Sequence, residues 1–442
     1  MSSLLLPPEA LRALLVRVVG DKAEQGHDVT GLDADLAALP PSYDELAAFA
    51  QRLAELPLRA DWPFVEPDDL DGIRGECDGA GELAVDAAAV GGRIETAWLG
   101  RVAGCVLGKP FEFDPTLDEL RAVLEPAGEW PLRDYVSAAT NARLRAPQPQ
   151  SAECVREGIR HVPEDDDLNY TVLALELLER HGADWTHDDL RRLWLLNLPV
   201  AATFGPERTQ LLAAGLGTVA GWAGVDVDAT SWTRVLNPAD EHCGALIRAD
   251  AFGYACPGRP DDAAALAHRD ATFTHRRTGV YAAMWVAAAI STALATDDWR
   301  VVAARAERVV PRRSRLGAIL RESRAEVEAA TDWLDGYARI HGRYADYTHC
   351  RVYQEIGTLL NTLRFADDVG HGIGLQVCQG NDTDSFGATA GSLLGALHGP
   401  AGLDPRWVAP FRDTIHLALA CVHERSLSAL GRRFAALPGA LA

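Results

Sequence analysis

Residues Gly380–Gly399 read GNDTDSFGATAGSLLGALHG, and this stretch joins an acidic segment to a helix of unusual composition. Glycines recur at every fourth position, at Gly387, Gly391, Gly395 and Gly399. A spacing of four places residues on one face of a helix, although each glycine costs about 1 kcal/mol of helix propensity relative to alanine. The row of glycines therefore predicts that the backbone of another element comes very close, as rows of small residues permit.

The acidic segment Asn381–Ser385 precedes this helix and can be interpreted in two ways. Asp382 and Asp384 gain from the helix dipole, and Asp384 and Ser385 are good capping residues. The same oxygens, held on a rigid helix, also suit a hard cation. This segment alone fits both interpretations.

A second acidic segment, HVPEDDDLNYT at residues 161–171, also opens a helix. Pro163 stands where a helix can start, and Glu164 and Asp165–Asp167 come before an apolar pattern at helical spacing. Alone, such a segment is typical of a solvated helix N-terminus. Two converging acidic segments repel each other, however, and a divalent cation removes that repulsion. Oxygen ligands without Cys or His favour Mg²⁺, Mn²⁺ or Ca²⁺ over zinc.

A third stretch, Arg93–Glu112, reads RIETAWLGRVAGCVLGKPFE and repeats the glycine spacing at Gly100, Gly104 and Gly108. Pro110 ends this helix, and Glu112 lies just beyond the end. The segment from Gly104 to Lys109 is not a phosphate-binding loop, because its glycine spacing is one residue short and Pro110 replaces the required Ser or Thr.

Composition restricts the class of protein. The 442 residues include 42 basic and 63 acidic side chains, for a net charge of -21, which argues against binding nucleic acid or anionic membranes through bulk charge. The eight cysteines form no CxxC pair and no disulfide-like spacing, so we expect a reduced, cytoplasmic environment. The longest apolar stretch, residues 280–295, is too short to span a membrane and is interpreted as a buried core helix.

The chain is expected to be all-α, because strand-like alternation is scarce and helical periodicity recurs along its length. Residues 1–85 are predicted to form a small N-terminal helical appendage, and residues 86–442 the main domain. The catalytic constellation is expected in the main domain.

Four motifs occur together, and in this order they resemble the ADP-ribosylglycohydrolase family: GCVLGKPFE, PEDDDLNYT, GALIRADAFGYACPG with RDATFTH, and GNDTDS. That family includes the enzyme that reactivates ADP-ribosylated dinitrogenase reductase. The resemblance runs from about Arg93 to Gly399. It implies a compact, orthogonal multi-helix domain with two Mg²⁺ ions, or Mn²⁺ ions, at its centre.

The resemblance also implies roles for single residues. The Thr-Asp-Asp metal motif of the family is matched by Asp165, Asp166 and Asp167, and its Asp-x-Asp-Thr/Ser motif by Asp382, Asp384 and Ser385. The catalytic glutamate is matched by Glu112, and Asp166 and Asp384 are also expected to be catalytic residues. This chain departs from the family at Asp165, which replaces a hydroxyl residue, at Leu168, and at Cys105, where an Asp is frequent.

Five further residues are candidates for binding the substrate, and each also has a purely structural interpretation. By the resemblance, His275 lies near the diphosphate, although a buried structural histidine fits equally. Phe252 and Tyr254 could stack on adenine or belong to the core. Gly244 and Arg248 could approach a phosphate.

The predicted function is Mg²⁺-dependent hydrolysis of an ADP-ribosyl glycosidic bond, which releases ADP-ribose from a modified macromolecule or small molecule. Such cleavage passes through an oxocarbenium-like state, and Glu112 could accept a proton from water or orient the ribose. Two alternatives remain. One is a metal-dependent hydrolase of a free nucleoside or nucleotide-sugar. The other is a non-catalytic, ADP-ribose-binding or structural relative, since the family includes lens crystallins.

Overall fold

A computed structural model describes residues 7–113, 115–144, 148, 150–224, 232–347 and 350–441. Within these residues the chain forms 22 α-helices and no β-strand, and its only β-type pairings are isolated bridges such as that between His27 and Leu58. The prediction of an all-α fold is confirmed.

The N-terminal helices are α1 (Pro8–Glu24), α2 (Leu32–Ala38), α3 (Tyr43–Ala54) and α4 (Leu70–Gly75). The main body continues with α5 (Val90–Gly108), α6 (Leu117–Leu124), α7 (Ala138–Asn141), α8 (Ser151–Cys154), α9 (Asp166–His181), α10 (His187–Asn197), α11 (Gly205–Trp222) and α12 (Trp232–Val235). It is completed by α13 (Asp250–Ala255), α14 (Pro260–Ala271), α15 (Arg277–Ala293), α16 (Trp299–Glu307), α17 (Arg315–Ala329), α18 (Trp333–Tyr344), α19 (Tyr353–Phe365), α20 (Val369–Cys378), α21 (Thr383–His398) and α22 (Leu427–Ala440). Two 3₁₀ segments matter for the site, η2 (Lys109–Phe111) and η7 (Cys243–Arg248).

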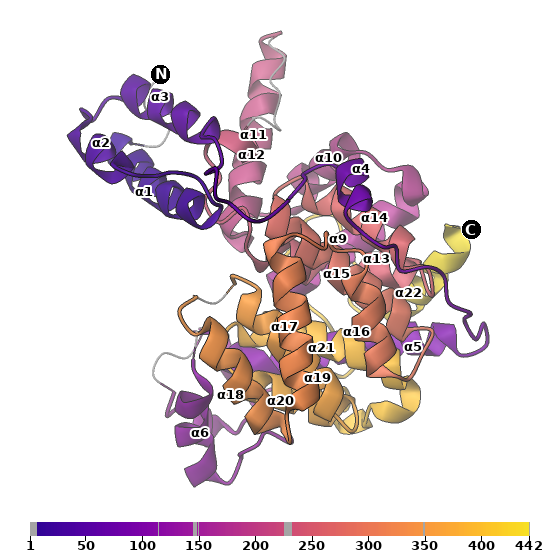
Figure 1. Cartoon of the computed structure of the whole chain (residues 1–442). Coiled ribbons are helices and arrows are strands. Elements are labelled where there is room, and N and C mark those ends of the chain that lie inside the picture. The colour runs from indigo at the N-terminus through magenta and orange to yellow at the C-terminus, as the bar shows by residue number, and fades with distance from the viewer. Residues whose placement is uncertain are drawn as a thin grey trace.

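The centre of the molecule is built around α15. Every residue of this alanine-rich helix from Thr278 to Ala293 is buried, as expected for a core helix. Figure 1 shows α5 and α21 within the same body, with α17, α19 and α20 in front of them. The small side chains of these helices allow close packing, and this places the ends of α5 and α21 inside the protein.

Helices α1–α3 form a separate layer with its own apolar core, in which Leu15, Leu46 and Leu53 are fully buried. Figure 1 shows this layer set apart from the main body. A polar anchor connects it to α17. Arg315 Nη1 donates to the carbonyl oxygen of Glu24 at 3.2 Å, and Arg315 Nη2 lies 2.8 Å from Glu66 Oε2.

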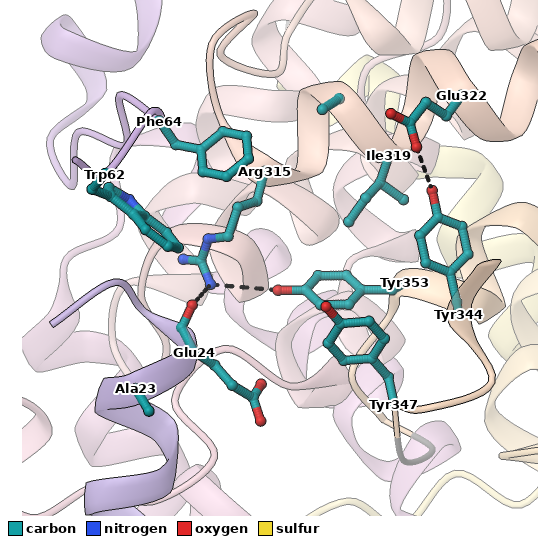
Figure 2. Close-up of a pocket in the computed structure, with 11 residues that line it drawn as sticks. Ala23, Glu24, Trp62, Phe64, Arg315, Ile319, Glu322, Tyr344, Tyr347 and Tyr353 are labelled. Atoms are coloured by element: carbon teal, nitrogen blue, oxygen red, sulfur yellow. Dashed lines mark hydrogen bonds between the residues drawn. The ribbon is translucent and has the colours of Figure 1, made fainter. Parts of the chain in front are cut away.

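A pocket of about 420 Å³ opens beside this anchor. Its wall includes Trp62 and Phe64 from the N-terminal segment and Tyr344, Tyr347 and Tyr353 from the main body, as Figure 2 shows. None of the acidic residues singled out from the sequence lines this pocket.

Candidate active site

The glycine rows of α5 and α21 lie against each other, as the sequence predicts. A Cβ atom on Gly387 would lie 2.6 Å from the carbonyl oxygen of Gly104, and one on Gly395 would lie 2.5 Å from that of Thr96. Side chains cannot be accommodated at such distances, so the two backbones are in direct contact. The crossing is antiparallel, because Gly108 near the end of α5 lies against Thr383 at the start of α21.

This crossing brings two of the predicted motifs together. Thr383 Oγ1 donates to the carbonyl oxygen of Gly108 at 2.8 Å. The residues that follow α5, Lys109 and Glu112, therefore lie beside the acids that open α21. The spacing between them is set by two helix backbones, which are stiffer than a loop.

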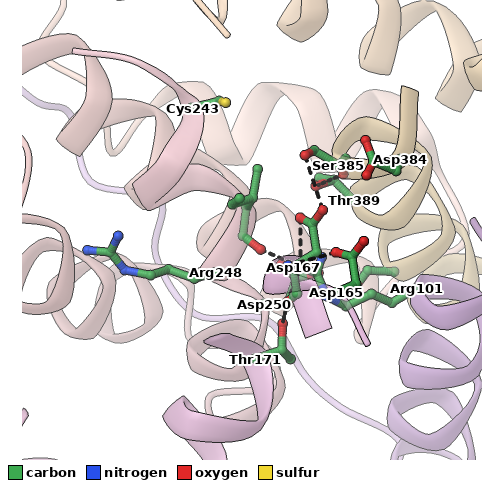
Figure 3. Close-up of polar contacts among 12 residues, drawn as sticks. Arg101, Asp165, Asp167, Thr171, Cys243, Arg248, Asp250, Asp384, Ser385 and Thr389 are labelled. Carbon is green, nitrogen blue, oxygen red and sulfur yellow. Dashed lines mark hydrogen bonds and ion pairs between the residues drawn. The ribbon is translucent and has the colours of Figure 1, made fainter. Parts of the chain in front are cut away.

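Helix α9 supplies the third motif. It begins at Asp166, three residues after the start suggested by Pro163, because Asp165 is its N-cap and accepts a hydrogen bond from the backbone N–H of Asp167 at 2.9 Å. Ser385 Oγ on α21 donates to Asp167 Oδ2 at 3.1 Å. Figure 3 shows Asp165, Asp167, Asp384 and Ser385 gathered in one place.

A fully buried arginine on α5 fixes the start of α9. Arg101 Nη2 donates to the carbonyl oxygen of Asp167 at 2.9 Å and also to that of Ile247 in η7. Its Nη1 lies 3.1 Å from Asp250 Oδ1. Arg101 thereby holds α5, α9, η7 and the start of α13 together beneath the acidic residues.

Lys109 lies among three carboxylates. Its Nζ is 2.8 Å from Glu112 Oε2, 2.8 Å from Asp165 Oδ2 and 3.1 Å from Asp384 Oδ2, and its side chain is 12% exposed. The chain contains only two lysines, Lys22 and Lys109, among 42 basic residues. A compact ammonium fits between three carboxylates, whereas the wide planar guanidinium of arginine does not. The extra negative charge that Asp165 adds relative to the family motif is thus neutralised by Lys109.

Glu112 and Asp166 form the open side of the acidic centre. Both are half-buried, whereas Asp165, Asp167, Asp382 and Asp384 are buried. Gln148 Nε2 donates to Glu112 Oε2 at 3.0 Å and to the Glu112 carbonyl oxygen at 3.1 Å. These bonds orient Glu112 while leaving part of its carboxyl group accessible.

The protonation of the acids follows from burial and from their neighbours. Burial raises the pKa of three aspartates well above the ordinary value, and the charges of nearby groups add to the effect; these are Asp166, Asp167 and Asp382. Burial, and then Asp384, raises the pKa of Glu112 to about 9. Burial acts to raise the pKa of Asp384 too, but the Lys109 ammonium and hydrogen bonds hold it below its usual value. Burial acts to lower the pKa of Lys109, but the surrounding carboxylates raise it, so the amine stays charged.

The donor set fits a hard cation. Carboxylates from two helix starts converge, and the buried Asp384 Oδ1 has no hydrogen-bond partner among the described residues. Hydroxyl and carboxylate oxygens are the ligands that Mg²⁺ and Mn²⁺ prefer. Asp384 and Ser385 contribute oxygens to this centre, and Lys109 neutralises the side of the centre formed by Asp165 and Glu112.

Three of the predicted substrate residues gather around a different group, the buried carboxylate of Glu207. Arg248 is ion-paired with Glu207 and Asp270 and donates to Thr274 Oγ1 at 2.7 Å. A Cβ on Gly244 would lie 2.6 Å from Glu207 Oε2. His275 is 1% exposed and lies 3.5 Å from Glu207.

These contacts give the three residues structural roles. The guanidinium of Arg248 is occupied by protein carboxylates, and Figure 3 shows it pointing away from the acidic centre. Burial, and then the charge of Arg248, lowers the pKa of His275 well below its usual value, so this histidine is neutral. Gly244 leaves room for Glu207. The three residues are parts of a buried ion-pair network, and their predicted roles in binding the substrate remain predictions.

Phe252 and Tyr254, the predicted candidates for stacking on adenine, both have fully buried rings. Phe252 packs on Trp185, with ring centroids 6.1 Å apart, and Tyr254 packs edge-on against Phe434 at 5.4 Å. Both rings thus lie in the core of this structure.

The sequence analysis missed Lys109, Arg101 and Gln148. Lys109 was noticed only as part of a failed phosphate loop, yet its position at the end of the glycine-rich helix and three residues before Glu112 marks it as a neighbour of the predicted base. Arg101 is a charged residue inside an otherwise apolar helix. That is a signal of a buried ion pair.

Together the fold and the site define an all-helical protein with a buried acidic centre of the kind that binds hard cations. A family model described as ADP-ribosylglycohydrolase matches residues 86–436, which is most of the chain. The chain belongs to the ADP-ribosylglycohydrolase family. Members of this family act on ADP-ribosylated substrates and are in general metal-dependent.

The structural comparison agrees with this assignment. A solved structure described as an ADP-ribosylglycohydrolase-related protein complex has the same fold, with a TM-score of 0.52 and 20% sequence identity over 80% of this chain and 100% of the other. No curated protein sequence matches the chain. Among the residues that the structure describes, no helix combines the length and apolar character needed to cross a membrane.

Proposed function

We propose that this protein hydrolyses an ADP-ribosyl glycosidic bond in a reaction that depends on a divalent cation and releases ADP-ribose. The observation that carries the proposal is the convergence of Glu112, Asp165–Asp167 and Asp382–Ser385 from the ends of three helices. Only the two residues that suit contact with water and substrate, Glu112 and Asp166, are more than slightly exposed there.

Glu112 is proposed to accept the proton of the attacking water or to orient the ribose. It can act as a base only as a carboxylate, and positive charge nearby favours that form. Lys109 supplies one such charge at 2.8 Å, yet burial and Asp384 still raise the pKa of Glu112 to about 9, so the base role also requires the charge of the proposed cation. Gln148 fixes the direction of the carboxyl group through its hydrogen bond to Glu112 Oε2.

The cation is proposed to be Mg²⁺, with Mn²⁺ as a substitute and two ions per chain. It would be held by Asp166, Asp167, Asp382, Asp384 and Ser385, with Asp165 contributing where Lys109 leaves an oxygen accessible. When bound, such ions bind ribose hydroxyls and lower the pKa of water. Arg101 and Ser385 hold Asp167 in place through the contacts described above.

The test is a turnover assay with metal-stripped protein. The substrates would be proteins carrying ADP-ribose through an N-glycosidic or an O-glycosidic linkage, a free nucleoside and a nucleotide-sugar, each with Mg²⁺ or with a chelator. We expect release of ADP-ribose from at least one modified protein, only with Mg²⁺, and loss of release in Asp384→Asn. The exposed acid Glu82 provides the control, because Glu82→Gln should keep full activity.

Binding of the product provides a second test. Calorimetry should show that ADP-ribose binds more tightly than AMP or ribose 5-phosphate, because the distal ribose reaches the acidic centre. Equal affinity for AMP, together with turnover of the free nucleoside alone, would favour the nucleoside or nucleotide-sugar hydrolase. Binding of ADP-ribose without any turnover would favour a non-catalytic relative.

A further inference from the structure

Two cysteines lie against one of the acids of the centre. Cys243 Sγ is 3.5 Å from Asp382 Oδ2, and Cys350 Sγ is 3.4 Å from the same oxygen. The two sulfur atoms and the oxygen all lie within 4.8 Å of one another. We propose that Cys243, Cys350 and Asp382 form a binding site for a thiophilic divalent cation, Zn²⁺, which adjoins the oxygen-lined centre proposed for Mg²⁺ and shares Asp382 with it.

The carboxylate of Asp382 contacts the two cysteines and does not cap its own helix. Asp382 is the N-cap residue of α21, yet its side chain makes no capping hydrogen bond. Asp165 has the same position on α9 and does cap, at 2.9 Å. The Asp382 carboxylate is therefore free of the capping role and lies between the two thiols, which contact Oδ2, and Asp384.

The distances match the coordination geometry of zinc. With Zn–S bonds of about 2.3 Å and a Zn–O bond of about 2.0 Å, a tetrahedral ion places sulfur and oxygen about 3.5 Å apart. The observed separations are 3.5 and 3.4 Å. The same edge between two sulfurs is about 3.8 Å, within the observed limit of 4.8 Å. The ion can therefore be received with little movement of the three side chains.

The chemistry of the donors distinguishes this site from the Mg²⁺ centre. Thiolates select zinc and other soft ions, whereas Mg²⁺ takes oxygen ligands. The sequence favoured Mg²⁺, Mn²⁺ or Ca²⁺ over zinc because the predicted ligands were all oxygens, but the fold brings Cys243 and Cys350 to Asp382. Cys350 is half-buried, so the site can be reached from solvent, whereas Cys243 and Asp382 are buried. Three protein ligands leave a fourth position for water.

Sharing of Asp382 couples the two sites. An ion on the cysteines withdraws Asp382 from the set of oxygens proposed for Mg²⁺. Zinc binding itself does not depend on the proposed hydrolysis, so it can be measured without a substrate.

The experiment is a zinc titration of the reduced, metal-stripped protein against a chromogenic chelator, with Mg²⁺ present throughout. We expect one tightly bound Zn²⁺ per chain. Cys243→Ser and Cys350→Ser should each weaken binding by more than the roughly 10–100-fold that loss of an outer-shell partner costs. Zinc should also protect Cys243 and Cys350 from alkylation, as mapped by mass spectrometry. Circular dichroism and melting curves establish that each variant is folded.

Two controls separate this site from other thiols. Cys421 is exposed, so Cys421→Ser should bind zinc like the wild type. Cys105 lies within 4.8 Å of Asp165 and Asp167, so Cys105→Ala tests that neighbouring cluster and should also keep the zinc. The proposal is overturned if the reduced wild type binds no zinc, if Cys105→Ala alone abolishes binding, or if the half-buried Cys350 is alkylated equally fast with and without zinc.

Discussion

Replacing Lys109 by methionine tests the electrostatics of the acidic centre directly. Lys109→Met keeps much of the side-chain volume and removes the charge that lies 2.8–3.1 Å from three carboxylates. Removing one partner of a buried ion pair costs about 3–5 kcal/mol, because the remaining charges stay buried and uncompensated. The raised pKa of Lys109 means that its contribution is complete below its unfolded value of about 10.5 and is lost only at higher pH, so the full effect is present at neutral pH.

The expected change in melting temperature follows from the size of the chain. An unfolding entropy of about 2.1 cal/mol/K per residue gives about 0.9 kcal/mol/K for 442 residues. The loss of about 3–5 kcal/mol therefore lowers the melting temperature by about 3–5 °C in the presence of a chelator. Added Mg²⁺ should raise the melting temperature of Lys109→Met more than that of the wild type, because the cation no longer competes with the ammonium for Asp165 and Asp384.

Calorimetry of the variant and of Lys22→Met provides the measurement and its control. Lys22 is the other lysine, is buried, and donates to Gln25 at 3.2 Å on α1. Lys22→Met should lower the melting temperature and leave the response to Mg²⁺ as in the wild type. The reasoning is refuted if Lys109→Met melts like the wild type in chelator, or if it stops responding to Mg²⁺. The second outcome would mean that Lys109 positions the metal ligands.

Three further predictions concern the same centre. Glu112→Gln should lower the rate of hydrolysis by roughly 10²–10⁴-fold and leave the Mg²⁺-induced rise in melting temperature nearly unchanged; loss of that rise would make Glu112 a metal ligand. The pKa of Glu112 is raised to about 9, so the stability that protonated Glu112 gives the metal-free protein is lost as the pH rises from about 4.5 through 9. Mg²⁺ should therefore raise the melting temperature more at about pH 9 than at about pH 6. An equal rise at both pH values would contradict this. Gly104→Ala would drive a Cβ into the backbone carbonyl group of Gly387 and should cost at least about 1–3 kcal/mol by overpacking. Gly215→Ala in α11, with nothing within 4 Å of the added Cβ, should be neutral or stabilising.

The sequence could predict the helices that carry the site and the closeness of two of them. Glycine at every fourth position has few explanations other than contact between backbones, and the distances around Gly387 and Gly395 confirm this interpretation. The acids at the two helix starts could be recognised because each lies beside a strong helical pattern. Periodicity is a local property of the sequence, so the helices could be predicted from it.

The contacts of these residues could not be predicted in the same way, because their partners come from distant parts of the chain. Lys109 and Asp384 are 275 positions apart, and Cys243 and Asp382 are 139 apart. Nothing in the spacing of the cysteines indicates that two of them meet one aspartate. Residue type alone can also mislead. Aromatic residues such as Phe252 and Tyr254 suit both a nucleotide site and a core, and an arginine such as Arg248 suits both a phosphate and a buried ion pair.

The scarcity of lysine has a practical consequence for studying this protein. Both lysines are paired and nearly inaccessible, with Lys22 5% exposed and the Lys109 side chain 12% exposed. Acylating reagents, which need an uncharged and accessible amine, therefore find no reactive lysine on the folded protein. The rate at which Lys109 is acylated measures how often the three carboxylates release it. Burial lowers the pKa of Lys22, so its acylation has to be mapped separately; the acylation of Lys109 then reports on opening of the centre without a substrate, a chromophore or an engineered probe.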